Sequence, residues 1–225
     1  MTATAPTSST AASGMKGTGK ASPAQDWLRE PQHRYIAAGV GLALIALIAW
    51  FVMMSGRRKE DFASRALDQA RSTAEQGNLP LAASEFQKVI STYGGTAAAQ
   101  EAVINLNQVR LINGQQELAA VNLQDFLKGT PSVQFRAPAY GLLGRALENS
   151  KRPGEAAAAY ENASKAAEFE YLKADLLLDA ARAYVNAGQK DKAIAAYRTV
   201  MKDYPKSGSK IEAEIRLAEL TSGTM

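Results

Sequence analysis

The chain has 225 residues, a formal net charge of +4, one histidine and no cysteine. Without cysteine, disulfide bonds, thiolate zinc sites and a cysteine nucleophile are excluded. Residues 1–59 hold seven Lys or Arg and two acidic residues, whereas residues 60–225 hold the other 19 basic and 20 acidic residues. The basic excess is therefore confined to the first 59 residues, and no nucleic-acid surface is expected on the rest of the chain.

The first 34 residues differ in composition from the rest of the chain. Residues 1–26 are mostly Thr, Ala, Ser, Gly and Pro, with few large apolar side chains to offset ordering entropy, so a disordered tail is expected. Residues 27–34 are interpreted as a short lead-in, where Trp27 suits the headgroup region of a membrane. The only histidine, His33, shows no partner for a pH-sensing role and is interpreted as an interfacial polar residue.

Residues 35–54 contain no charged side chain. A helix rises about 1.5 Å per residue, so this run would span about 30 Å, the thickness of a hydrocarbon core. We therefore predict a single transmembrane helix over residues 35–55. A cleaved signal peptide is the alternative, but no small-x-small cleavage site follows, and the basic cluster Arg57-Arg58-Lys59 resembles an interface anchor. Equal numbers of basic residues flank the two ends of the span. The cluster directly after it favours a cytoplasmic C-terminus.

Residues 60–225 repeat themselves with a step of 37 residues, in units near 63–99, 100–136, 137–173 and 174–210 and a capping helix over 211–221. Apolar residues recur at three- and four-residue spacings, which indicates amphipathic helices. The first of these helices is expected to follow the membrane span closely, with Gly56 as the bend.

Three positions mark the helical hairpin in each unit. The second helix opens with a small residue: Ala82, Ala119, Ala156 and Ala193. A large apolar anchor follows four residues later: Phe86, Leu123, Tyr160 and Tyr197. The turn position is held by Gly77, Gly114, Lys151 and Gly188. In the third unit we expect the neighbouring Pro153-Gly154 to make the turn, since Lys151 is not a glycine. In-phase repetition of this kind is typical of a stacked helical array.

The pattern resembles tetratricopeptide repeats, which combine a Leu-Gly pair, a Tyr, small residues, an aromatic residue and a Pro. The third and fourth units carry the resemblance with these residues: Tyr140, Leu143, Gly144, Ala156, Tyr160 and Ala163, then Ala181, Tyr184, Ala193, Tyr197 and Pro205. The second unit departs from it, with Asn107 and Arg110 at the small and aromatic positions. The expected fold is all-α: a single transmembrane helix followed by a right-handed superhelical array of tetratricopeptide-like hairpins.

A short tail, one span and a repeat array also resemble the layout of the YfgM-like ancillary translocon-subunit family. This resemblance implies a single-pass protein of the bacterial inner membrane, with a periplasmic array that holds polypeptides or chaperone and translocon components. The alternative is a structural subunit or assembly factor of a membrane complex, anchored through its transmembrane helix. The oligomeric state is left open.

Residues suited to catalysis are scarce. No glycine-rich phosphate loop follows a strand, and the single histidine lies beside the predicted span. We therefore expect neither an enzyme nor a metal or cofactor site.

The array is instead expected to bind protein or peptide partners in a concave groove formed by the first helices of the units. Stacking places equivalent positions in columns, and one column reads Arg71, Gln108, Arg145 and Arg182. One turn further on, the next column reads Glu75, Ile112, Asn149 and Asn186. Arg beside Asn resembles the carboxylate clamp of some tetratricopeptide domains. The alternative is that these arginines pair with neighbouring acids such as Asp179 or Glu148.

Overall fold

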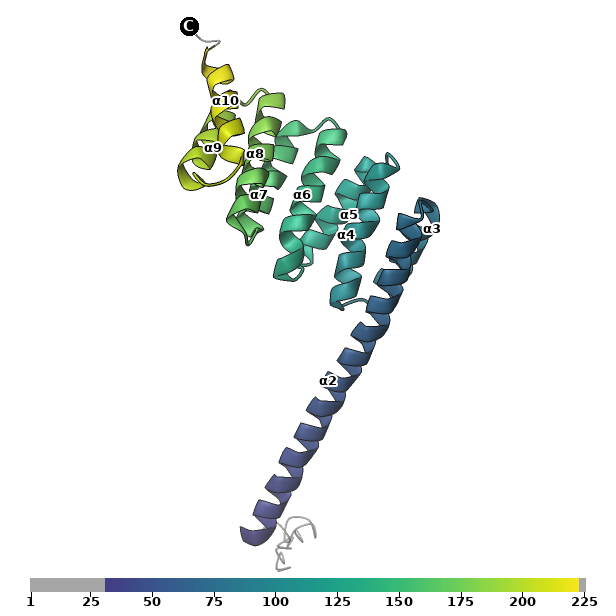
Figure 1. Cartoon of the computed structure of the whole chain (residues 1–225). Coiled ribbons are helices and arrows are strands. Elements are labelled where there is room, and N and C mark those ends of the chain that lie inside the picture. The colour runs from purple at the N-terminus through teal and green to yellow at the C-terminus, as the bar shows by residue number, and fades with distance from the viewer. Residues whose placement is uncertain (1–30, 223–225) are drawn as a thin grey trace, which may run out of the picture. The chain divides into compact units, whose positions relative to one another are not determined.

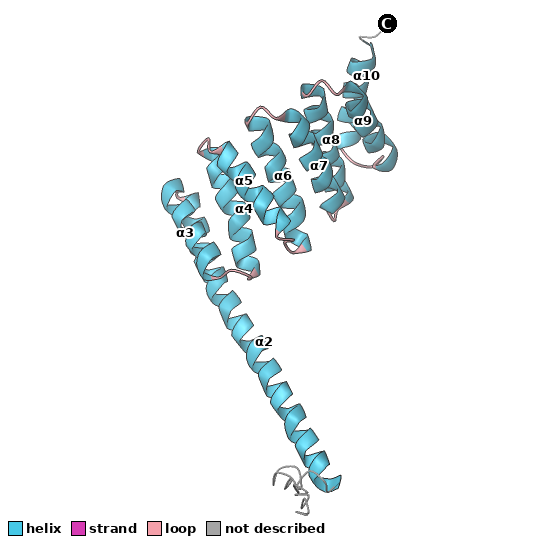
Figure 2. Ribbon diagram, turned by 180° about the vertical axis from the view of Figure 1, so that it is seen from behind, coloured by secondary structure: helices cyan, strands magenta, loops and turns pink. Residues whose placement is uncertain are grey.

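The computed structural model describes residues 31–222, and apart from short loops this part of the chain is helical (Figures 1 and 2). The helices are α2 (Pro31–Glu75), α3 (Leu79–Thr92), α4 (Ala97–Ile112), α5 (Gln116–Lys128), α6 (Val133–Asn149), α7 (Pro153–Ala166), α8 (Glu170–Asn186), α9 (Lys190–Asp203) and α10 (Ser209–Ser222). The chain divides into two compact units, Met1–Met54 and Ser55–Met225, each of which is described by itself. The expected all-α class is confirmed.

The first unit contributes the apolar part of α2. This stretch includes the predicted span, and the part of the chain that the structure describes contains one helix long and apolar enough to cross a membrane, with a mean hydropathy of 2.2 and none of that window buried. Helix α2 continues through Gly56, the predicted bend, to Glu75. The predicted tail, residues 1–26, and the first four residues of the lead-in lie outside the described residues.

In the second unit, four inter-helix turns share one backbone conformation. Gly77, Gly114, Lys151 and Gly188 have φ values of 81°, 71°, 61° and 70°. In each turn the next residue donates its N–H to a carbonyl five residues earlier, over 2.8–3.2 Å, as Asn78 does to Thr73. This is the Schellman arrangement, which satisfies the last carbonyls of a helix and normally uses glycine.

The third turn corrects the sequence prediction. Pro153 and Gly154 are the first residues of α7 and do not form the turn. Lys151 itself adopts the left-handed conformation, and Arg152 donates its N–H to the Leu147 carbonyl at 2.9 Å. The pattern of backbone hydrogen bonds across four turns is therefore kept at the expense of local strain in one lysine.

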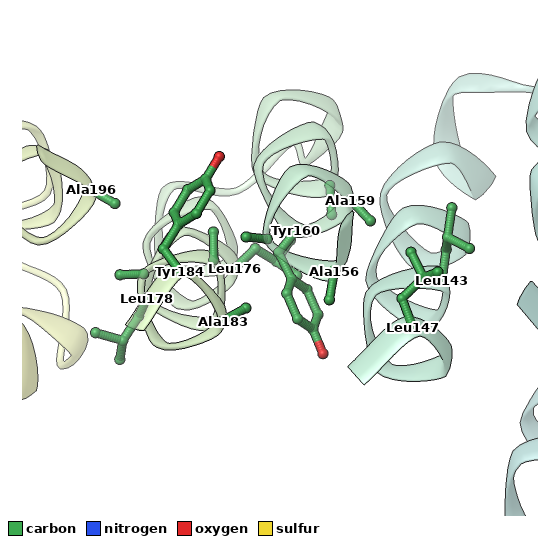
Figure 3. Packing of buried hydrophobic residues seen from close by; sticks show 14 of the residues in the cluster. Leu143, Leu147, Ala156, Ala159, Tyr160, Leu176, Leu178, Ala183, Tyr184 and Ala196 are labelled. Carbon is green, nitrogen blue, oxygen red and sulfur yellow. The ribbon is translucent and has the colours of Figure 1, made fainter. Parts of the chain in front are cut away.

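Two clusters of buried residues form the core. One runs from Ala63 to Val109 and the other from Ala119 to Ala213. Alanines in the first turn of the second helices are fully buried. The ring of Tyr160, from α7, lies against Gly144 of α6, and Tyr184, from α8, has Lys192 of α9 over its ring at 5.3 Å (Figure 3). Small residues let neighbouring helix axes approach, and the large rings fill the remaining space.

A buried polar network lies where the two clusters meet. Asn107 is fully buried, and its Nδ2 donates to the Val103 carbonyl at 2.8 Å and to Asn122 Oδ1 at 2.7 Å. Arg110 Nη1 donates to Asn107 Oδ1 at 3.1 Å. The two departures from the repeat pattern in the second unit are thus partners of each other.

Candidate groove on the first helices

The residues predicted to form the groove lie on α4, α6, α8 and the last part of α2. All six lie on helix surfaces: Arg71 is half-buried, and Gln108, Arg145, Asn149, Arg182 and Asn186 are exposed. Stable helices position them, since each of these helices ends in a Schellman turn at the same point in the repeat. The structure brings some of these side chains into shared cavities but not all.

Arg71 and Gln108 line one cavity of about 360 Å³ between α2, α3 and α4. Glu75 and Ile112, from the second predicted column, line it as well. Arg71 is not free, because it pairs with Glu101 of α4 and its Nη1 lies 3.5 Å from Asp68 Oδ1. Two carboxylates therefore already surround the guanidinium at this end of the groove.

Arg182 and Asn186 line a second cavity, of about 330 Å³, near the C-terminus. Arg182 pairs with Asp179 one turn earlier in α8, which is the alternative that the sequence raised. Partial burial acts to lower the pKa of Arg182, but the hydrogen bond to Asp179 and the charges of Glu212 and Glu148 outweigh it and leave that pKa raised. Arg182 therefore stays a cation, and a guanidinium has further N–H donors to offer a ligand.

Arg145 and Asn149 lie on α6, between the two cavities in the chain, and line neither. Arg145 is exposed and makes no ion pair within residues 31–222. It is therefore the arginine of the predicted column that is most available to an anionic group.

Glu148, the other acid raised as a partner for the arginines, is bound by a tyrosine. The Tyr160 hydroxyl donates to Glu148 Oε2 at 2.7 Å. Burial, followed by this bond and the neighbouring carboxylates, raises the pKa of Tyr160. Burial and a hydrogen bond to Glu161 likewise raise the pKa of Tyr184 to about 12. Both tyrosines are thus uncharged parts of the core, and Tyr160 is the apolar anchor that the sequence predicted.

A third and larger cavity, about 660 Å³, lies among α2, α4 and α6. None of the predicted residues except Arg71 lines it, and Glu60, Asp68, Glu101 and Asn105 were not predicted. The columns could have revealed Glu101: two turns before the arginine column, equivalent positions read Ser64, Glu101, Pro138 and Asp175. The first three of these residues line the cavity.

Comparisons with known proteins agree with this architecture. A family model described as a tetratricopeptide repeat-like domain matches residues 26–222, most of the chain. No curated protein matches the chain.

Two solved structures are similar over most of their length. One is the MamA protein, with 22% identity and a TM-score of 0.57 over 72% of this chain and 81% of that one. The other contains nearly identical tetratricopeptide-like repeats assigned to a kinesin light chain of Podosopora anserina, with 17% identity and a TM-score of 0.57 over 71% and 85%. At these identities the likeness concerns the fold alone.

Proposed function

Since the chain belongs to the tetratricopeptide repeat-like family, whose repeats generally serve as protein-interaction scaffolds, we propose that it is a membrane-anchored scaffold that binds polypeptides along its first helices. The observation that carries the proposal is the row of cavities on that face, together with the cations Arg145 and Arg182. Binding in this groove involves no reaction, so no catalytic role is proposed.

The anchor in this proposal is residues 35–55. Its support is the uncharged run and the exposed apolar surface of α2, where Leu42, Ile45 and Phe51 are at least 65% exposed. Side chains of this kind are stable in a hydrocarbon environment and costly in water. We further propose the inner membrane of a bacterium, with the array in the periplasm and a role close to that of the YfgM-like ancillary translocon subunits.

Within the groove, we propose that the pair Arg145 and Asn149, with Arg182 and Asn186 one unit further on, holds a carboxylate of the bound polypeptide. Charge-assisted hydrogen bonds from arginine and an amide contact from asparagine suit that group. Arg71 and Gln108 would contact the polypeptide further along. The Glu101 and Asp68 contacts of Arg71 make it a weaker anion ligand than Arg145.

In-cell photocrosslinking of the full chain tests the groove. A photoreactive residue at Gln108 or Asn149 should crosslink to polypeptides, whereas the same residue at Lys165 or Lys202, exposed on second helices, should not. Arg145→Ala with Arg182→Ala should reduce the groove crosslinks about tenfold, the loss expected for one or two charged hydrogen bonds. Arg198→Ala, an exposed arginine on α9, is the matched control.

The alternative function has a distinct outcome. If crosslinking survives the double arginine change but disappears when residues 35–55 are exchanged for an unrelated span, the partner is held through the membrane helix. The chain would then be a structural subunit or assembly factor. Protease treatment of intact spheroplasts tests the orientation: a periplasmic array is digested without lysis, and protection of the array would overturn this part of the proposal.

A further inference from the structure

The 660 Å³ cavity among α2, α4 and α6, here called the acidic basin, differs in charge from the rest of the groove. Its walls carry three carboxylates, from Glu60, Asp68 and Glu101, and one cation, Arg71. Its apolar surface comes from Leu67, Ile104 and Phe135. A cavity of this kind offers a hydrophobic contact surrounded by negative charge.

The carboxylates are only partly satisfied. Arg71 is shared between Glu101 and Asp68, so one cation faces two anions. Glu60 accepts hydrogen bonds at 2.9 Å from the N–H groups of Ala97 and Ala98, so the positive end of α4 offsets part of its charge. Asp68 has a single cation contact at 3.5 Å, and its side chain is 72% exposed. The basin therefore keeps an excess of negative charge, and Asp68 is its most available carboxylate.

One polar group in the basin also lacks a partner. Asn105 Nδ2 is buried and has no hydrogen-bond acceptor among residues 31–222. A buried donor without an acceptor matches the C=O of a peptide backbone.

We infer that the acidic basin binds a polypeptide segment in which a Lys or Arg adjoins a large apolar residue. The apolar side chain packs on Ile104 and Phe135, the cation lies near Asp68 and Glu101, and Asn105 donates to a backbone carbonyl. This inference rests on the proposed function and deepens it. With an acidic basin at one end and Arg145 and Arg182 at the other, the groove selects the direction in which a segment with separated opposite charges lies.

The test measures fluorescence anisotropy of short labelled peptides with the full chain in nanodiscs of zwitterionic lipid, and with empty nanodiscs as the blank. The three probes have the same sequence except between the leucines, where they carry Lys, Gln or Glu. The Lys probe should bind about tenfold more tightly than the Gln probe and more tightly still than the Glu probe. Its affinity should fall as salt rises, because the attraction is electrostatic.

Asp68→Asn with Glu101→Gln should remove the Lys preference and leave the weak apolar binding of the Gln probe unchanged. The matched control is Glu117→Gln with Asp125→Asn, which removes two exposed carboxylates from α5 and should keep the preference. Asp68→Asn alone, whose carboxylate is mostly exposed, provides a second variant whose folding is not in question.

Each outcome has one meaning. An equal loss in the control pair, or no loss in the basin pair, overturns the inference. If the Lys and Glu probes bind alike while crosslinking at Asn149 persists, the basin inference fails and the proposed function stands. If neither probes nor crosslinks are seen, both fail together.

Discussion

At the scale of single residues, Lys151 holds a position that the other three inter-helix turns give to glycine. Its φ of 61° is left-handed, a conformation that costs an L-residue with a side chain about 1–2 kcal/mol. The turn keeps both of its hydrogen bonds, from Lys151 to Glu148 and from Arg152 to Leu147, each at 2.9 Å. The strain is therefore local and is offset by the helices on either side.

Lys151→Gly is expected to stabilise the chain by about 0.5–1 kcal/mol, because relief of the left-handed strain exceeds the added freedom of the unfolded chain. Urea unfolding of the full chain in detergent measures the change. Gly188→Ala, at the same position one unit later, is the opposite control and should destabilise by a similar amount. A Lys151→Gly variant less stable than the wild type would contradict the strain argument.

Residue roles were predictable where they follow from position in the repeat. The buried alanines, the aromatic anchors and the glycine turns all follow from the 37-residue step. The ion pairs of Arg71 and Arg182 were harder, because long side chains choose among several neighbours within reach. Glu60 and Asn105 lie earlier in their helices than Arg71 and Gln108, and neither is a residue that the repeat pattern specifies. Finding them would have required comparing equivalent positions nearer the start of each helix.

At the scale of helices, the α6–α7 pair depends on the missing side chain of Gly144. A Cβ built at this position would lie 2.5 Å from Cε1 of the buried Tyr160 ring. That ring is held from its other end by the hydroxyl bond to Glu148. Helix α6 therefore approaches α7 along a line that only glycine permits.

Gly144→Ala is expected to destabilise the chain, because overpacking against a fixed ring costs about 1–3 kcal/mol and exceeds the roughly 1 kcal/mol that alanine gains as a helix former. Thermal unfolding followed by circular dichroism measures this. Gly141→Ala is the control in the same helix: its Cβ would meet only a leucine methyl group at 3.4 Å, so stability should hold or rise. Similar losses in both variants would show that helix α6 needs glycine for another reason.

The sequence predicted the order of these helices, but the second helices begin three residues before the predicted alanines, as α3 does at Leu79 rather than Ala82. The sequence did not predict that α6 would include Pro138 as its sixth residue, because proline usually marks a helix end. The helix tolerates it near its start, at a place where α6 borders the acidic basin. Tertiary packing outweighs local preference there.

At the scale of the whole array, the Asn107 network joins α4, in one buried apolar cluster, to α5, in the other. In the fourth unit the equivalents of Asn107 and Asn122 are Ala181 and Ala196, and both are buried. A stack of repeats is stabilised by contacts between neighbours, so a polar contact in place of an apolar one weakens coupling at that point. The helices before it should open more readily than those after it.

Hydrogen exchange of the full chain should show faster exchange in α3 and α4 than in α7 and α8. Asn107→Ala alone should cost about 1–3 kcal/mol, since Asn122 loses its partner. Adding Asn122→Ala should recover most of that loss and narrow the difference in exchange, because the pair then matches Ala181 and Ala196. Equal exchange rates across the array in the wild type would contradict this weaker coupling.

The four turns share one hydrogen-bond pattern, and this makes the array extensible. Each repeat turns at the same position, with one left-handed residue and the same pair of backbone hydrogen bonds. Joining the chain at one turn to the residue that follows the neighbouring turn removes or adds one 37-residue step and keeps the hydrogen-bond pattern of the turn. A lineage that duplicates or loses such a step can therefore lengthen or shorten the binding surface while leaving the chemistry at its two ends intact.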